Sequence, residues 1–172
     1  MRFHLLDRVT LLTESRIEAE KYVSQAEEYL ADHFPSFPVL PGVMMLEAAT
    51  QAAAWLAMHR AGFAGDGDYT GPTVAVLKSA RNLRYGHFVA PGHSLRLGID
   101  FDKDVEGGLA VKISGTVDVD GDTKTAVTGK LELSLLRLAD REAALAPRDD
   151  QLVAAHRARW TALVGTSAVA SQ

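Results

Sequence analysis

The sequence has 172 residues, of which 47% are hydrophobic and 23% are charged, and its formal net charge is −4. This size and composition favour one globular domain over two domains or a disordered chain. The negative charge argues against nucleic-acid binding, which needs a basic face to neutralise phosphates. The sequence contains no cysteine, which excludes disulfides, thiolate metal sites and thiol nucleophiles and fits a reducing cytoplasm.

The N-terminal segment does not have the pattern of an export signal, because Asp7 and Arg8 interrupt the apolar run that a signal peptide needs. The longest apolar stretch, residues 43–58, is shorter than the ~20 residues of a membrane span and contains Glu47 and Gln51. We therefore expect a soluble, cytoplasmic protein.

The first predicted elements are two strands, over residues 2–12 and 16–23. Ser24 and Glu27 then have the spacing of a reciprocal helix cap, which predicts a short helix over about residues 25–31.

Three prolines, Pro35, Pro38 and Pro41, exclude helix from the next segment, because each lacks a backbone donor and restricts the residue before it. His33 is therefore expected on a stiff loop. From Gly42 to about Arg60 good helix formers dominate and the pattern is apolar almost all round, which predicts a buried central helix.

After a glycine-rich loop at residues 61–71, the sequence predicts an antiparallel sheet of five or six strands in total. Hydrophobic and polar residues alternate with a period of two, and Asp120-Gly121 is a favoured pair for a tight hairpin. One long helix and an antiparallel sheet define an α+β protein. The additional strands are expected near residues 73–86, 94–101, 111–119 and 127–135.

The segment after about residue 139 is charged at first and then predicts a helix capped by Asp149 or Asp150, followed by a frayed tail over residues 166–172. One stripe of this helix is of mixed polarity, so we expect it to pack on the outside of the domain. The stripe consists of Leu152, Ala155, Arg159 and Leu163.

The candidate chemistry lies between His33 and Gln51. Glu47 and Gln51 share a helix face, and a buried, ionised, unpaired glutamate costs several kcal/mol, so Glu47 needs a partner or a proton. Taken alone the pair has a purely structural interpretation, and a lone loop histidine usually lies on the surface. Pro41-Gly42 adds free N–H groups at the helix start. A base, an acid and an oxyanion donor together indicate proton abstraction beside a carbonyl.

The stretch HFPSFPVLPGVMMLEAATQ, residues 33–51, resembles the signature of the 3-hydroxyacyl-acyl carrier protein dehydratases of fatty acid synthesis. The resemblance continues in FVAPGHSLRLGIDF and GKLELSLL and covers roughly residues 1–138. Ser36 and His93 replace the usual glycine and aspartate, and the residues after about 139 have no counterpart in the shortest members.

The resemblance implies a hot-dog fold over residues 1–138, with a sheet wrapped around one helix. The residue pattern predicts a mostly helical C-terminal extension over residues 139–172. The resemblance also implies that His33 is the catalytic base and Glu47 the acidic partner. It further implies that the Gly42 N–H polarises the thioester carbonyl and that Gln51 orients the glutamate. No metal or other cofactor is implied. Family members form dimers in which one subunit's histidine faces the other's glutamate, with a trimer of dimers as the larger assembly.

Two interpretations of the surface stay open. Lys78, Arg81 and Arg84 form either a solvated strand face or a landing site for acyl carrier protein, with coenzyme A thioesters as the alternative substrates.

The residues expected to contact the acyl group are Pro41, Val43, Met44 and Phe88; Met45 and Trp55 are further candidates, with ordinary core favoured for Trp55.

The sequence therefore predicts conversion of a 3-hydroxyacyl thioester to a trans-2-enoyl thioester and water. A glutamate at position 47 favours dehydration without isomerisation. The rival functions are a non-catalytic acyl-binding hot-dog protein and a hot-dog thioesterase. The remaining histidines lack metal-ligand spacing and are expected on the surface or in loops: His4, His59, His87, His93 and His156.

Overall fold

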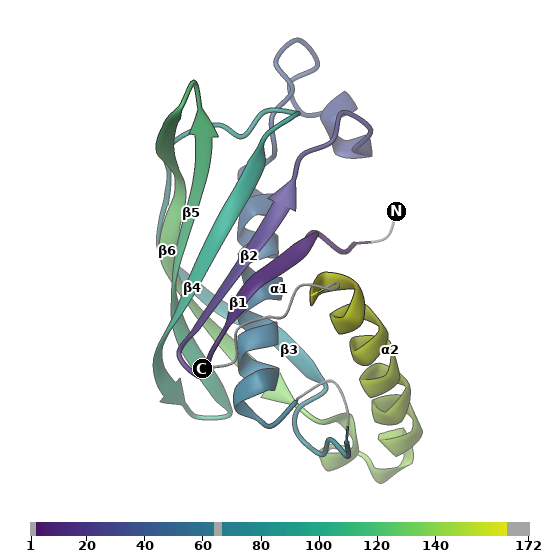
Figure 1. Ribbon diagram of the computed structural model, residues 1–172. Coiled ribbons are helices and arrows are strands. Elements are labelled where there is room, and N and C mark those ends of the chain that lie inside the picture. The colour runs from purple at the N-terminus through teal and green to yellow at the C-terminus, as the bar shows by residue number, and fades with distance from the viewer. Residues whose placement is uncertain (1–2, 64–66, 165–172) are drawn as a thin grey trace.

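The computed structural model describes residues 3–63 and 67–164. They contain a six-stranded antiparallel sheet in the order β1-β2-β4-β5-β6-β3, with the long helix α1 against one face and a second helix, α2, beside α1 (Figure 1). This is the hot-dog arrangement that the resemblance implies. The strands are β1 (Arg8–Leu12), β2 (Arg16–Tyr22), β3 (Val74–Tyr85), β4 (Ser94–Val105), β5 (Gly108–Val119) and β6 (Asp122–Leu136). The helices are α1 (Gly42–Arg60), α2 (Ala146–Val164) and the short 3-10 turns η1 (Glu28–Ala31), η2 (Leu138–Asp140) and η3 (Ala143–Leu145).

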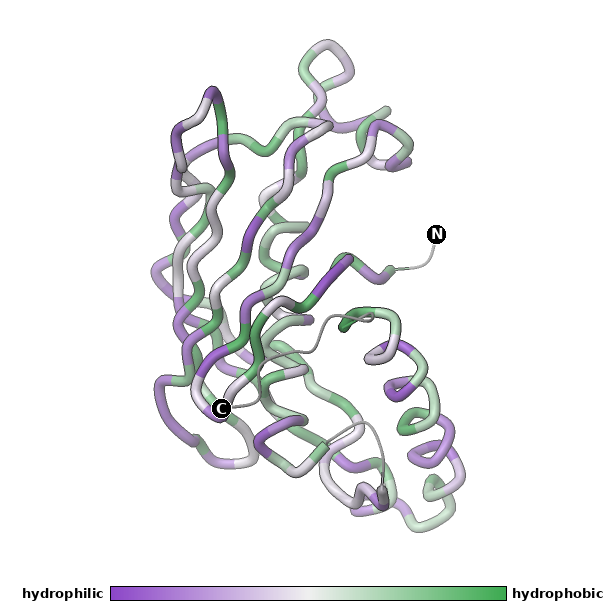
Figure 2. The backbone as a smooth tube through the Cα atoms, in the orientation of Figure 1, coloured by the Kyte–Doolittle hydropathy of each residue, from purple (hydrophilic) through white to green (hydrophobic). Residues whose placement is uncertain are grey.

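The strands follow the predicted alternation, and Figure 2 shows hydrophobic and hydrophilic residues taking turns along them. On β4, for example, Leu95, Leu97 and Ile99 are almost completely buried. The expected hairpin between β5 and β6 is confirmed, because Asp120 and Gly121 both have left-handed backbones with φ of 52° and 83°. A similar turn at Gly107, with φ of 67°, joins β4 to β5.

The central helix has the predicted bounds. Pro41 precedes it with an extended ψ of 139°, and Gly62 ends it with a left-handed φ of 90°, while the Phe63 N–H closes the last turn onto Met58 O at 2.9 Å. α1 packs against β2, β3, β4, β5 and β6, which explains its nearly continuous apolar surface. Within residues 3–63 and 67–164, no helix combines the length and apolar composition needed to cross a bilayer.

The helix cap predicted before His33 is wrong. Only η1 forms there, and Glu27 does not complete a reciprocal cap with Ser24, whose Oγ accepts from Ala26 N at 3.2 Å. Instead the Glu27 carboxylate accepts a hydrogen bond from Lys21 Nζ. Lys21 is only 4% exposed on β2, and a buried ammonium group requires a counter-charge, so this ion pair takes precedence over the cap.

The cap predicted for the C-terminal helix is also wrong. α2 begins at Ala146, so Asp149 lies inside its first turn, where it is fully buried. Its carboxylate accepts hydrogen bonds from Thr73 Oγ1, Leu138 N and Ala139 N, the last two at 3.1 and 2.8 Å. Asp149 therefore fastens the extension to the start of β3. The tail predicted over residues 166–172 lies outside the described residues.

Candidate active site

His33 lies on the loop between η1 and α1 and is held at two points. Its backbone N–H donates to Tyr29 O at 3.0 Å, and its ring Nδ1 lies 3.1 Å from Val39 O. A carbonyl oxygen only accepts, so Nδ1 carries the proton in this contact. In the neutral imidazole, Nε2 is then left with the lone pair that a general base needs.

The backbone beside His33 is strained. Phe34 has a φ of 56°, a left-handed conformation that a bulky residue rarely adopts, and its ring lies 4.2 Å from the His33 ring. A tight turn stabilises this geometry, because the Phe37 N–H donates to Phe34 O at 2.7 Å. Strain of this kind costs about 1–3 kcal/mol and clusters at functional sites. The loop is thus shaped around the orientation of His33.

Glu47 and Gln51 interact along α1, as their spacing predicts. Gln51 Nε2 donates to Glu47 Oε1 at 2.9 Å and to Phe3 O at 3.0 Å, while Gln51 Oε1 accepts from Leu5 N at 3.0 Å. The N-terminal segment therefore fixes which way the Gln51 amide points. The expectation that Glu47 is buried is wrong for the single chain, because its side of α1 is only partly covered and the residue is half-buried.

Gly42 begins α1, and its N–H belongs to the first turn, which has no acceptor further back in the helix. Later in the first turn, Met44 N and Met45 N donate to Pro41 O at 2.9 and 3.1 Å. A Cβ atom at position 42 would lie 3.0 Å from the Tyr85 ring, so the absence of a side chain lets β3 approach the start of the helix.

Large apolar side chains surround the start of α1 and remain exposed. Phe37 and Phe88 meet edge to face with their ring centroids 5.4 Å apart. Among the residues expected to contact the acyl group, Val43 and Phe88 are exposed, Met44 is half-buried, and Pro41 and Met45 are buried. We call the exposed set the apolar surface: Phe34, Phe37, Val43, Tyr85 and Phe88.

The three basic residues expected to form a patch, Lys78, Arg81 and Arg84, are all exposed on β3, and Lys78 pairs with Glu132 at 3.0 Å. Arg84 shares a shallow depression with Lys112 and Lys130, which are cross-strand partners on β5 and β6. We call Arg81, Arg84, Lys112 and Lys130 the basic surface. Sequence reasoning missed the two lysines because they are far from Arg84 in the chain.

The expectation for the other histidines is wrong for His156. It lies on α2, half-buried, where its Nε2 donates to Thr73 O at 2.9 Å and its ring packs against Trp55 at 5.8 Å. Trp55 is buried, in agreement with the core position that the sequence favoured for it. Over the described ranges, no three His, Asp or Glu side chains gather in a group that would hold a metal ion.

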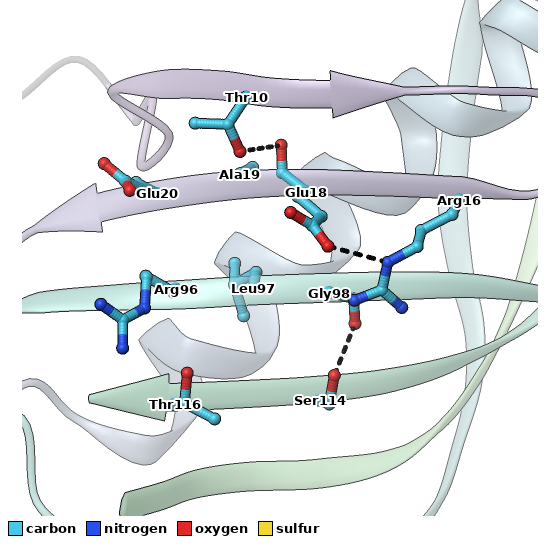
Figure 3. A pocket seen from close by; sticks show the side chains of 10 residues that line it. All are labelled: Thr10, Arg16, Glu18, Ala19, Glu20, Arg96, Leu97, Gly98, Ser114 and Thr116. Atoms are coloured by element: carbon cyan, nitrogen blue, oxygen red, sulfur yellow. Dashed lines mark hydrogen bonds and ion pairs between the residues drawn. The ribbon is translucent and has the colours of Figure 1, made fainter. Parts of the chain in front are cut away.

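A polar depression of about 210 Å³ lies on the face of the sheet away from α1 (Figure 3). Arg16 lines it and pairs with Glu18 at 2.9 Å and Asp100 at 2.5 Å, and Arg96 pairs with Asp118. The Arg16–Asp100 and Arg96–Asp118 pairs join neighbouring strands and are of the kind that stabilise sheets, whereas Arg16 and Glu18 lie on the same strand, β2. None of the residues that line this depression comes from the 33–51 stretch.

His33 and Glu47 are positioned by separate networks. Among the described residues, no hydrogen bond or ion pair joins them: His33 is held by Tyr29 and Val39, and Glu47 by Gln51. A loop histidine with a free Nε2, a glutamate in a fixed orientation and a helix N-terminus form a set of groups suited to acid–base chemistry beside a carbonyl.

Comparison with known proteins agrees with this fold and motif. Residues 1–128 match the model of the FabA-like domain, and the chain belongs to that family. It is 32% identical over 133 residues to the 3-hydroxyacyl-[acyl-carrier-protein] dehydratase FabZ of Clostridium perfringens (strain SM101 / Type A), an alignment that covers 77% of this chain and 88% of the relative. It is 36% identical over 135 residues to the FabZ of Lactococcus lactis subsp. cremoris (strain MG1363), an alignment that covers 78% of this chain and 86% of that relative.

Solved structures share the fold at lower identity. An uncharacterized protein from Erwinia carotovora subsp. atroseptica superposes with a TM-score of 0.54 at 20% identity, covering 76% of this chain and 93% of that protein. A Streptococcus mutans UA159 protein, whose structure was solved bound to acetyl CoA, superposes with a TM-score of 0.51 at 14% identity. The superposition covers 76% of this chain and 88% of that protein. The family match ends before η2, so α2 lies outside it.

Proposed function

We propose that the protein is a dehydratase that converts a 3-hydroxyacyl thioester, carried by acyl carrier protein, into the trans-2-enoyl thioester and water. The observation that carries this proposal is the contact between His33 Nδ1 and Val39 O, because it leaves Nε2 as a base in a fixed position. The FabZ relatives, which are named for this activity, support the choice of substrate.

In the proposed reaction, His33 Nε2 removes the proton from C2 while the Gly42 N–H stabilises the charge that develops on the thioester carbonyl oxygen. The electrons of the C2–H bond form the C2=C3 double bond, and the C3–O bond breaks. Glu47 protonates the departing hydroxyl, which leaves as water. In a second version, His33 moves the proton alone and Glu47 holds a water molecule.

The proposed assembly is a homodimer in which His33 of one subunit and Glu47 of the other share a substrate. Two features of the single chain support it: β3 is an edge strand of the sheet, and the apolar surface lies around the start of α1. Exposed apolar patches and free strand edges both favour pairing with another chain. A trimer of dimers stays a prediction.

The function is tested by hydration of a crotonyl thioester, the reverse reaction, with His33→Ala and Glu47→Gln. Loss of a general acid or base typically lowers the rate by about 10²–10⁴-fold, so we expect at least a hundredfold loss in each variant with unchanged circular dichroism. A loss below about tenfold in either variant contradicts its assignment. Release of free thiol by the wild-type protein would instead identify a thioesterase, and binding without turnover an acyl-binding protein.

A further inference from the structure

A further hollow, a mostly apolar cavity of about 350 Å³, lies between α1, α2 and the N-terminal segment. From α1 it is lined by Ala54, Trp55 and Met58 among others, and from α2 by Leu152, Ala155 and Leu163. Its volume lies in the lower part of the roughly 300–1,000 Å³ range of small-molecule pockets. Apolar walls of this kind select an apolar ligand.

The cavity adjoins the candidate active site through Gln51. The Gln51 side chain lines the cavity and also donates to Glu47 Oε1 at 2.9 Å. Further lining residues follow on α1 as far as Met58, seven residues on, so the cavity runs ~10 Å along the helix at 1.5 Å per residue. One side chain, that of Gln51, therefore lies between Glu47 and the cavity.

The outer wall of the cavity is fixed rather than loose. Trp160 of α2 packs on Trp55 of α1 with ring centroids 5.2 Å apart, and Arg159 donates to Leu6 O. The buried Asp149 fastens the start of α2 to Thr73. Because α2 is held at both ends, the space beneath it keeps its shape when empty, and the side chains of Leu152, Ala155 and Leu163 form its wall on the α2 side.

We propose that this cavity receives the alkyl tail of the acyl thioester, and that α2 sets the length of tail that the protein accepts. The proposal rests on the proposed function for the identity of the substrate. The occupant is an unbranched alkyl chain of medium length, since the cavity is ~10 Å long and its lining is predominantly apolar. The tail enters the subunit that contributes Glu47, the residue joined to the cavity by Gln51.

Binding is measured directly by intrinsic fluorescence, because the chain has two tryptophans and both lie at the cavity: Trp55 lines it and Trp160 packs on Trp55. The probes are the pantetheine thioesters of trans-2-decenoate and crotonate. We expect the decenoyl thioester to change the emission and to bind at least tenfold more tightly than the crotonyl thioester. Equal affinities for the two probes would overturn the proposal.

Ala155→Phe projects a bulky ring into the cavity, and Ala154→Phe is the matched control, because both alanines are exposed on the same helix but only Ala155 lines the cavity. We expect Ala155→Phe to remove the decenoyl response and to lower the ratio of kcat/KM for decenoyl over crotonyl substrate at least tenfold. Ala154→Phe should preserve both. If Ala155→Phe does not fold, Leu152→Ala, which enlarges the cavity, should shift the preference toward longer chains.

The outcomes separate the two proposals. An inactive wild-type protein that still gives the decenoyl response, sensitive to Ala155→Phe, refutes the dehydratase function and supports the cavity as an alkyl site. An active protein whose chain-length profile is the same in wild type, Ala155→Phe and Leu152→Ala refutes the role of α2 and leaves dehydration intact. A response to free decanoate but not to its thioester also refutes the proposal.

Discussion

Gln51 Nε2 lies 2.9 Å from Glu47 Oε1, one helical turn away on α1, and the same amide is fastened to the N-terminal segment at Phe3 O and Leu5 N. A glutamine amide has two ends, and the contact with Leu5 N requires an oxygen, so the nitrogen end must face Glu47. The orientation of the proposed acid therefore depends on a segment more than forty residues away in the sequence.

The first prediction concerns this positioning. Gln51→Leu should lower kcat about ten- to a hundredfold with little change in KM, because a catalytic group displaced by ~1 Å loses up to about 10² in rate. Thr50→Val is the control, since its hydroxyl donates to Leu46 O at 2.9 Å and not to Glu47. Steady-state kinetics and thermal unfolding are measured together. A lowered melting temperature with unchanged kcat would show that Gln51 is only structural.

The second prediction is that the active site is shared between subunits. His33→Ala and Glu47→Gln chains, each inactive, are mixed, dissociated and reassembled. Random pairing makes half of the dimers mixed, and each mixed dimer of two-fold symmetry has one intact site of two, so about a quarter of wild-type activity should return. Subunit exchange proven by differently tagged chains, with no recovery of activity, would place both residues in one chain's site.

The third prediction is that the basic surface docks the carrier protein. The double variant Arg81→Glu, Arg84→Glu should raise KM for substrate on acyl carrier protein, with an effect that shrinks as salt increases, because exposed charges steer encounter and are screened. The KM for a crotonyl pantetheine thioester should not change. The double variant Arg141→Glu, Arg148→Glu, which reverses two exposed cations beyond the sheet, is the charge-matched control. Equal effects on both substrates would mean that the surface is structural.

The fourth prediction concerns the anchor of α2. Burial alone would raise the pKa of Asp149, but hydrogen bonds from Thr73, Ala139 and Leu138 outweigh it and hold that pKa below its ordinary value. A lowered folded-state pKa means that the ionised carboxylate stabilises the fold above the unfolded-state pKa of about 3.9, and that this contribution is lost as the pH falls through the folded-state pKa.

Asp149→Asn should therefore lower the melting temperature at neutral pH, and the difference from wild type should shrink as the pH falls below about 4. Asp150→Asn, at the exposed neighbouring position, should follow wild type throughout. Thermal unfolding across this pH range makes the comparison. If the melting temperature of Asp149→Asn is lower than that of wild type by the same amount at every pH, the charge of the carboxylate plays no part in holding α2.

Those features that depend only on neighbouring residues could be predicted from the sequence. The bounds of α1 follow from Pro41 before it and Gly62 after it, and the β5–β6 turn follows from Asp120-Gly121. The candidate site could be predicted for the same reason, because its residues lie within one loop and the helix that follows it. Backbone dihedral preferences and the periods of helix and strand act over a few residues, so they can be inferred without the fold.

Contacts between residues that are distant in the chain could not be predicted in this way and became known only from the folded structure. Glu27 serves the buried Lys21 rather than a helix cap, and Asp149 accepts from Thr73, because burying a charge costs more than leaving a helix end uncapped. The mixed stripe of α2 that includes Leu152 and Leu163 becomes the wall of a cavity over α1. These outcomes depend on the packing of elements far apart in the chain, which creates partners and desolvates charges in ways that no local pattern encodes.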